Sequence, residues 1–219
     1  MKLEEIKENI PEKAYERLAE KIDILRPSQE KSILAGLFDK ESLLVCTPTA
    51  SGKTFVAELA MLKTIKEKLG KTVYVVPLKA LASEKYKDFK EKYSSIAKVA
   101  LSIGNTDSAE TYLDQYDIII TTSEKFDSLM RHHTPWLNKI NTLIVDEIHL
   151  LNDPGRGPTL EVVITLLRQM LSDIQIIGLS ATIGNPKELA DWLGAKLIVD
   201  KWRPVKLYEG VYYNNEITF

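Results

Sequence analysis

A glycine, a lysine and a threonine in succession are the first residues suited to phosphate chemistry. Gly52-Lys53-Thr54 comes after the apolar run Leu43–Cys46 and before a long amphipathic stretch, so a strand, a turn and a helix are expected in that order. Backbone N–H groups at such a helix start attract phosphate oxygens. Lys53 adds a cation for the β- and γ-phosphates, and the Thr54 hydroxyl can reach magnesium. Thr47–Thr54 is therefore predicted to bind ATP and Mg²⁺.

The first position of this loop departs from the usual pattern, because Thr47 stands where phosphate-binding loops carry a glycine. Gly-Lys-Thr alone is short enough to arise by chance, and an ordinary strand–turn–helix is the competing interpretation. The strand before the loop and the helix after it favour phosphate binding. The predicted nucleotide ligands in the loop are Thr49, Ala50, Ser51, Gly52, Lys53 and Thr54.

Two neighbouring carboxylates supply the second requirement of ATP chemistry. Asp146 and Glu147 directly follow the apolar run Thr142–Val145, and ligands bind at the carboxyl ends of strands in parallel sheets. Asp146 is expected to hold magnesium together with Thr54, while Glu147 orients or deprotonates the attacking water. Glu147 and Lys53 are the predicted catalytic residues. Without the phosphate-binding loop, two carboxylates that begin a solvated loop would be the simpler interpretation.

The apolar pattern predicts the elements that position these residues. Seven short runs rich in β-branched residues are continuous rather than alternating, which is typical of parallel strands buried on both faces. They are Leu43–Cys46, Thr72–Val76, Val99–Leu101, Asp117–Ile120, Thr142–Val145, Ile174–Ile177 and Leu197–Val199. Amphipathic stretches predict helices at Thr54–Leu69, Lys79–Tyr93, Ser123–Arg131, Gly157–Leu171 and Pro186–Leu193. This alternation predicts an α/β fold, with a doubly wound, mostly parallel sheet and helices on both faces.

The two ends of the chain depart from this alternation. Before the first strand, helical spacing is present over Pro11–Ile22. A second helix is expected over 29–38, with Ser28 as its cap and Leu34 among its buried residues. After the last strand, Val205–Tyr213 is expected to be an extended edge strand that leads out of the domain.

Composition limits the classes of function. The single cysteine excludes an internal disulfide and a zinc site built from several cysteines, and a reducing compartment fits best. No run approaches the roughly 20 apolar residues that span a bilayer, and the charged N-terminus lacks a secretory signal. We therefore expect a cytoplasmic protein without a membrane partner. The net charge of −2 does not indicate a nucleic-acid binder, so nucleic acid would have to bind in a local groove.

Ile148-His149 completes the string Asp-Glu-Ile-His, which resembles the DExH box of superfamily-two helicases. Other strings agree with that superfamily in order and spacing: Thr47–Thr54 resembles motif I, Pro77–Lys85 motif Ia, Thr121–Asp127 motif Ib, Ser180–Thr182 motif III and Pro27–Gln29 the Q-motif. Finer features resemble the Ski-type branch, and they look closest to archaeal Hjm-type DNA repair helicases: Leu78–Lys85, Ser123–Asp127, Gly155–Glu161 and Trp202–Val205. The resemblance extends from about Ile22 to Tyr213.

This resemblance implies a RecA-like P-loop domain, the first of two motor domains in an ATP-dependent nucleic-acid helicase. It divides the chain into an N-terminal helical lead-in at 1–24, the RecA-like domain at 25–204, and an exit strand or linker at 205–219. A second RecA-like domain of the same parent chain would complete the ATP site with arginine fingers, which contribute about 10³–10⁵ in rate. Because no motif IV, V or VI follows, the isolated chain is expected to bind ATP weakly and hydrolyse it very slowly.

The same resemblance implies roles for further residues. Gln29 would read the adenine edge, and His149 would couple the ATP site to motif III through Ser180 and Thr182. Three residues would lie on the track of single-stranded nucleic acid: Lys79, Thr122 and Arg156. Their contacts would go to phosphates and give affinity without base preference. An exposed glutamine at a helix start and a solvated surface lysine are the simpler interpretations of Gln29 and Lys79.

Three functions remain open at this point. The leading hypothesis is an ATP-driven helicase that moves on single-stranded DNA in repair or recombination, which would be nucleoid-associated. The same motor acting on RNA is the nearest alternative, because the Ski-type branch contains both and no residue indicates a contact with a 2′-hydroxyl. A regulatory nucleotide-binding module without translocation belongs to another class. The arrangement from DExH box to motif III argues against that module.

Overall fold

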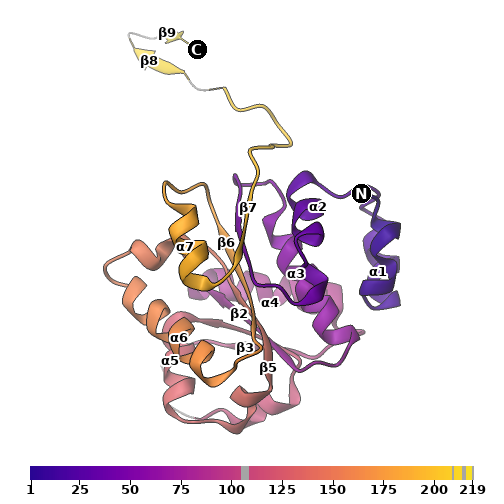
Figure 1. The fold of residues 1–219 in the computed structure, drawn as a ribbon, viewed down its shortest axis with the longest axis vertical. Helices are drawn as coiled ribbons and strands as arrows, with labels where there is room; N and C mark the ends of the chain where they lie inside the picture. Colours follow the sequence, from indigo (N-terminus) through magenta and orange to yellow (C-terminus); the bar gives the residue numbers. More distant parts are fainter. Residues whose placement is uncertain (105–108, 209, 214–215, 219) are drawn as a thin grey trace.

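The computed structural model describes residues 1–104, 109–208, 210–213 and 216–218. Within them, seven parallel strands form one sheet in the order β3-β4-β2-β5-β6-β1-β7 (Figure 1). The strands are β1 Leu43–Cys46, β2 Lys71–Val76, β3 Val99–Ser102, β4 Ile118–Thr122, β5 Ile140–Val145, β6 Gln175–Ser180 and β7 Lys196–Val199. Each lies on one of the predicted apolar runs. The predicted α/β fold with a parallel sheet is confirmed.

Alternating residues of the strands supply two separate cores. In β1, Leu43 and Val45 face one hydrophobic cluster, and Leu44 and Cys46 face the other. Successive side chains of a strand point to opposite faces of its sheet. A continuous apolar run therefore requires a layer of helices on each side.

Seven α-helices of the described residues form these two layers. The first face carries α1 Glu12–Ala19, α2 Pro27–Leu34, α3 Lys53–Lys66 and α4 Lys79–Tyr93; the second carries α5 Ser123–Arg131, α6 Gly157–Met170 and α7 Pro186–Leu193 (Figure 1). The predicted bounds of α4, α5 and α7 are confirmed. Helix α3 ends three residues earlier than predicted, because Lys68 and Gly70 take positive φ values of 54° and 143° and leave the helical region.

The predicted helix over 29–38 is wrong in its details. Helix α2 begins at Pro27, so Ser28 lies inside it and Arg26 is the residue before its first turn. The helix ends at Leu34, which is 71% exposed rather than buried. Gly36 with a φ of 102° breaks the helix, and the short 3₁₀-helix Leu37–Asp39 then turns Leu37 into the core. The break explains the exposure of Leu34, because the predicted period does not continue past it.

The two ends of the chain behave differently. The 3₁₀-helix Leu3–Asn9 and α1 pack into the first core, through Leu3, Ile6 and Ala14. The predicted strand over 205–213 is reduced to β8 Val211–Tyr213, which pairs antiparallel with β9 Glu216–Thr218. It is not an edge strand of the main sheet, and Figure 1 shows this segment extending away from the sheet after β7. No helix in the described ranges has the length and apolar character needed to cross a bilayer.

The order of the strands decides where the candidate site lies. Strand β6 pairs with β5 on one side and with β1 on the other. Because all three are parallel, the loop after β1 and the carboxylates after β5 leave the sheet at the same edge. The N–H of Thr47 donates to the carbonyl of Ser180 at 3.2 Å, which fixes the loop against the end of β6.

A buried carboxylate ties the helix of the phosphate-binding loop to the next helix. The side chain of Glu58, in α3, is 5% exposed. Its carboxylate accepts from the Tyr93 hydroxyl and from Lys92 Nζ at 3.3 Å, both in α4. A buried charge without partners is strongly unfavourable, so these contacts fix α3 and α4 relative to each other.

Replacing Lys92 by methionine should therefore lower the free energy of unfolding. We expect a loss of about 1–2 kcal/mol, because the buried Glu58 carboxylate loses its cation while half-exposed Lys92 is already partly solvated. Glu58→Gln in the same chain should recover most of the loss. Urea unfolding measures both effects, with Lys87→Met, at an exposed position of the same helix, as the control. Equal loss in Lys92→Met and Lys87→Met would contradict the assignment.

Candidate nucleotide-binding site

The loop between β1 and α3 has the backbone of a phosphate cradle. Gly52 and Ala50 take positive φ values of 94° and 64°. For alanine this left-handed conformation costs roughly 1–2 kcal/mol, so surrounding contacts must hold it. The hydroxyls of Thr47 and Ser51 lie 2.7 Å apart in a hydrogen bond. The Ser51 N–H donates to the carbonyl of Pro48 at 3.2 Å.

The start of α2 braces this loop from outside. Gln29 Nε2 donates to the carbonyl of Gly52 at 3.1 Å, and Gln29 Oε1 accepts from the Arg26 N–H at 2.9 Å. Arg26 Nη1 donates to the carbonyl of Ala50 at 2.7 Å. Gln29 is only 4% exposed, so it is not the exposed helix-start residue of the simpler interpretation. One end of its amide holds the loop through Gly52, and the other end caps the start of α2 through Arg26.

The loop lysine and the acidic pair meet across β6. Lys53 Nζ lies 3.1 Å from Glu147 Oε1 and 3.2 Å from Oε2. Glu147 has a φ of 50°, and its N–H donates to Asp146 Oδ1 at 3.0 Å. The structure therefore brings the two predicted catalytic residues, Lys53 and Glu147, into direct contact.

A tyrosine that the sequence did not single out orients Asp146. The Tyr74 hydroxyl, from β2, donates to Asp146 Oδ2 at 2.9 Å. Burial raises the pKa of Tyr74 well above its usual range, and the neighbouring Asp146 charge adds to the shift. The hydroxyl therefore stays protonated and remains a donor. The signal in the sequence was a tyrosine inside a fully buried strand, where its hydroxyl needs a partner.

The predicted coupling residues lie beside the site without bonding to one another. His149 Nδ1 is 3.4 Å from Glu147 Oε2, too poorly placed for a hydrogen bond. Ser180 is fully buried at the end of β6, and Thr182 is exposed beyond it. No hydrogen bond joins His149 to either residue in the part of the chain that the structure describes. His149 does line a hollow together with Ile183, Gly184 and Asn185.

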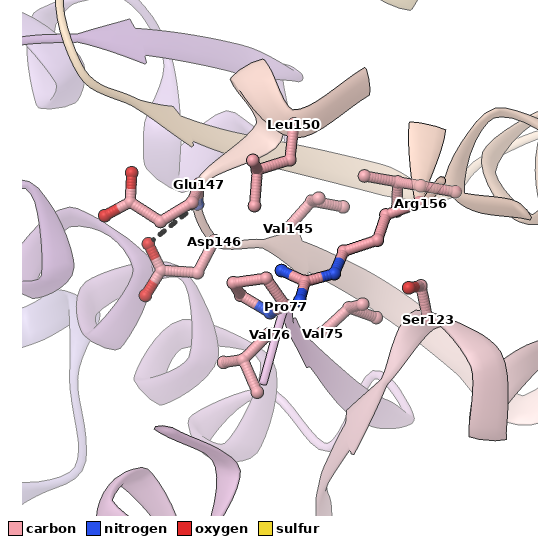
Figure 2. A pocket seen from close by; sticks show the side chains of 10 residues that line it. Val75, Val76, Pro77, Ser123, Val145, Asp146, Glu147, Leu150 and Arg156 are labelled. Atoms are coloured by element: carbon pink, nitrogen blue, oxygen red, sulfur yellow. Dashed lines mark hydrogen bonds between the residues drawn. The ribbon is translucent and has the colours of Figure 1, made fainter. Parts of the chain in front are cut away.

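A second hollow lies on the other side of the acidic pair. Figure 2 shows the Arg156 side chain reaching from the start of α6 across this hollow toward Pro77, with Ser123 on one side and Asp146 on the other. The ends of β2 and β5 form its apolar floor. Arg156 is thus directed into the protein, between the acidic pair and the first turn of α5.

The other two residues predicted to contact single-stranded nucleic acid have different surroundings. Lys79 is exposed at the first position of α4. Thr122 is only 2% exposed, and its hydroxyl oxygen accepts from the Lys125 N–H at 3.4 Å as the cap of α5. The hydroxyl of Thr122 is therefore engaged in the fold, which the sequence did not show.

The cysteine beneath the loop is a small buried side chain. Cys46 is 3% exposed in β1. Burial raises the pKa of its thiol, although Ser180 and Lys53 oppose the shift. The neutral thiol packs under the loop and does not resemble a reactive thiolate.

The fold and these contacts together define an α/β P-loop domain. Its phosphate-binding loop faces Asp146 and Glu147 at the end of β5, with β6 lying between β1 and β5. The chain matches the DEAD/DEAH box helicase family over residues 26–189, and it belongs to that family.

Several archaeal relatives carry the name ATP-dependent DNA helicase Hel308. That of Pyrococcus abyssi is 53% identical over 94% of this chain and 28% of the relative, and that of Pyrococcus horikoshii is 51% identical over 97% and 29%. That of Methanocaldococcus jannaschii is 52% identical over 89% and 17%. The chain spans less than a third of the length of these relatives.

Solved helicase structures share the fold. The crystal structure of the DUF1998 helicase MrfA bound to DNA and AMPPNP is similar with a TM-score of 0.76 and 29% identity, covering 89% of this chain and 30% of that one. The same helicase bound to DNA alone gives a TM-score of 0.74 and 27% identity, covering 89% and 30%.

The close approach of α2 to Gly52 makes this glycine sensitive to substitution. A Cβ at Gly52 would lie 2.5 Å from Gln29 Nε2 and 3.0 Å from Arg26 Cδ, at a φ of 94°. Gly52→Ala should lower the free energy of unfolding by about 1–2 kcal/mol. Gly184→Ala is the matched control, because no atom lies within 4 Å of its Cβ position and its φ is not left-handed. Similar denaturant midpoints for the two variants would refute the close approach.

Proposed function

We propose that this chain is the ATP-binding motor domain of an ATP-dependent DNA helicase. The observation that carries the proposal is the 3.1 Å contact between Lys53 and Glu147, which joins the phosphate-binding loop to the acidic end of β5. The names of the archaeal relatives support the same activity. Because those relatives are much longer, the activity of a whole helicase is proposed for a parent protein and not for this chain alone.

The residues of the loop fit ATP and magnesium. The positive φ values of Ala50 and Gly52 curve the backbone as an anion-binding nest requires. We assign the N–H groups of 49–54 and the Lys53 ammonium to the phosphates. Thr54 and Asp146 would hold magnesium, which prefers one or two protein oxygens together with phosphates and waters. Bound magnesium would neutralise the charge that develops on the phosphates.

Glu147 is proposed to orient or deprotonate the attacking water. Its contact with Lys53 keeps the carboxylate close to the position of the terminal phosphate. Tyr74 holds the neighbouring Asp146 through Oδ2, so the two carboxylates are fixed in different roles. We propose that His149 couples this pair to motif III, Ser180 and Thr182, because Ile183, directly after motif III, lines the same hollow as His149.

A second RecA-like domain is proposed as the partner that completes the site. The relatives are more than three times the length of this chain, which leaves room for such a domain. Arginine fingers from it would supply about 10³–10⁵ in rate. Turnover by this chain alone is therefore expected to be slow.

Single-stranded DNA is the proposed nucleic-acid partner. The neighbouring helicase MrfA is bound to DNA in its crystal structure, and the Hel308 relatives are named DNA helicases. Lys79, Thr122 and Arg156 begin or cap α4, α5 and α6 at the same edge of the sheet. Thr122 would contribute through its backbone, because its hydroxyl is engaged. Arg156 would contribute by turning out of its hollow toward a phosphate.

Lys53→Ala should abolish nucleotide binding while the fold persists. Lys53 supplies the cation for the phosphates, but its pair with Glu147 is partly exposed, so its loss should change stability by less than about 1 kcal/mol. Calorimetric titration with ATP·Mg²⁺ and thermal unfolding measure the two effects. Lys66→Ala, at the exposed end of the same helix, should leave binding intact. ATP binding by Lys53→Ala equal to that of the unaltered chain would exclude the proposed site.

Matched DNA and RNA strands of the same sequence should bind with different affinities, DNA more tightly. Fluorescence anisotropy at several salt concentrations measures this. Lys79→Ala should weaken DNA binding and reduce the slope of log K against log[salt] by about 1. Lys87→Ala, farther along the same helix, is the control. Tighter RNA binding would favour an RNA helicase. An unchanged slope would show that Lys79 does not contact the phosphates of the nucleic acid.

A further inference from the structure

Arg26 contacts the phosphate-binding loop and the segment after β7 at the same time. Its Nη1 donates to the carbonyl of Ala50 at 2.7 Å. Its Cζ lies 5.5 Å from the centroid of the Trp202 ring, within the range of a cation–π interaction. These two contacts, Ala50 to Arg26 and Arg26 to Trp202, are called the Arg26 bridge below.

The Trp202 end of the bridge is held by α2 a second time. Lys31 Nζ pairs with Asp200 Oδ2 at 2.7 Å and donates to the carbonyl of Val199 at 3.2 Å. The Trp202 N–H donates to Asp200 Oδ1 at 2.6 Å, and the Asp200 side chain is 8% exposed. The position of Trp202 is therefore fixed by α2 rather than by the extended segment beyond it. Trp202 itself is 38% exposed.

The Ala50 end of the bridge sets the direction of one peptide in the loop. The carbonyl of Ala50 and the N–H of Ser51 belong to the same planar trans peptide and point in opposite directions. Arg26 holds that carbonyl, and the Ser51 N–H donates to Pro48 instead of pointing into the cradle. A phosphate nest needs successive N–H groups turned toward the anion. For Ser51 to join it, this peptide must rotate and the carbonyl of Ala50 must leave Arg26.

We infer that Arg26 is a positioning residue that opposes nucleotide binding. When a nucleotide does bind, Arg26 passes the change in the loop on to Trp202. The inference rests on the proposed nucleotide site. In one state Arg26 holds the Ala50 peptide away from the phosphates and packs on Trp202. In the other state the nucleotide turns that peptide, and Arg26 loses one of its two partners. The segment after β7, which leads to the proposed second domain, then changes its contact with α2.

The affinity of the 219-residue chain for ATP·Mg²⁺ tests the first half of the inference. Arg26→Ala should bind ATP about three- to tenfold more tightly in calorimetry, because one partly exposed charge-assisted hydrogen bond no longer opposes rotation of the peptide. Arg26→Lys keeps a cation that can reach Ala50 and should restore much of the original affinity. Unchanged or weaker binding by Arg26→Ala would overturn the inference, and weaker binding would make Arg26 a nucleotide ligand.

Tryptophan fluorescence tests the second half. ATP·Mg²⁺ should change the emission of the unaltered chain, and Trp202→Phe should remove that change while calorimetry still detects binding. Trp136, which is 1% exposed, should contribute little to the signal. Arg26→Ala should also lose most of the change, whereas Lys201→Ala, the exposed neighbour of Trp202, should keep it. A signal that survives in Trp202→Phe or in Arg26→Ala would show that the bridge does not report nucleotide binding.

Failure of this inference is distinguishable from failure of the proposed function. If the unaltered chain does not bind ATP, the proposed nucleotide site is wrong. If the unaltered chain binds ATP and Lys53→Ala does not, the site is right, and an Arg26→Ala affinity equal to that of the unaltered chain overturns only the bridge. Thermal unfolding of Arg26→Ala, Arg26→Lys and Trp202→Phe checks that each variant is folded.

Discussion

The parallel pairing of β6 with both β1 and β5 is the constraint on which the candidate site depends. It brings a loop near residue 50 and a carboxylate pair near residue 147 to one edge of the sheet, one strand apart. The register is fixed because each strand feeds two cores, so a slip of one residue would exchange every side chain between them. Lys53 and Glu147 reach each other only because that register is held.

The polar groups of the site are satisfied mainly by one another. Lys53 pairs with Glu147, Tyr74 holds Asp146, and Gln29 holds Gly52. A ligand that enters must replace some of these contacts, so its net gain is the difference between two sets of hydrogen bonds rather than the sum of the new ones. These existing contacts therefore limit the affinity of the site for a ligand. A domain that adds further cations would shift the equilibrium toward the bound state.

The sequence predicted those features that depend on neighbouring residues. The strands that precede Lys53 and Asp146 are continuous apolar runs. The Gly-Lys-Thr string marks the turn between a strand and a helix. What could not be predicted depends on contacts between segments or on the backbone conformation of single residues. The hydrogen bonds that join the Gln29 amide to Gly52 and to Arg26 were not expected. Leu34 was expected in the core, but the left-handed Gly36 ends its helix. Neither the contact with Gly52 nor the left-handed conformation of Gly36 follows from the spacing of apolar residues.

The nucleotide site and the proposed nucleic-acid contacts can influence each other without a long pathway. The hollow of Figure 2 has the acidic pair on one wall, and Ser123 and Arg156 at the starts of α5 and α6 on the others. A shift of Asp146 or Glu147 would change the space into which Arg156 is directed. Because protein interiors are closely packed, such a shift moves neighbouring side chains rather than being absorbed. Coupling between the two sites then requires only residues already in contact with the same hollow.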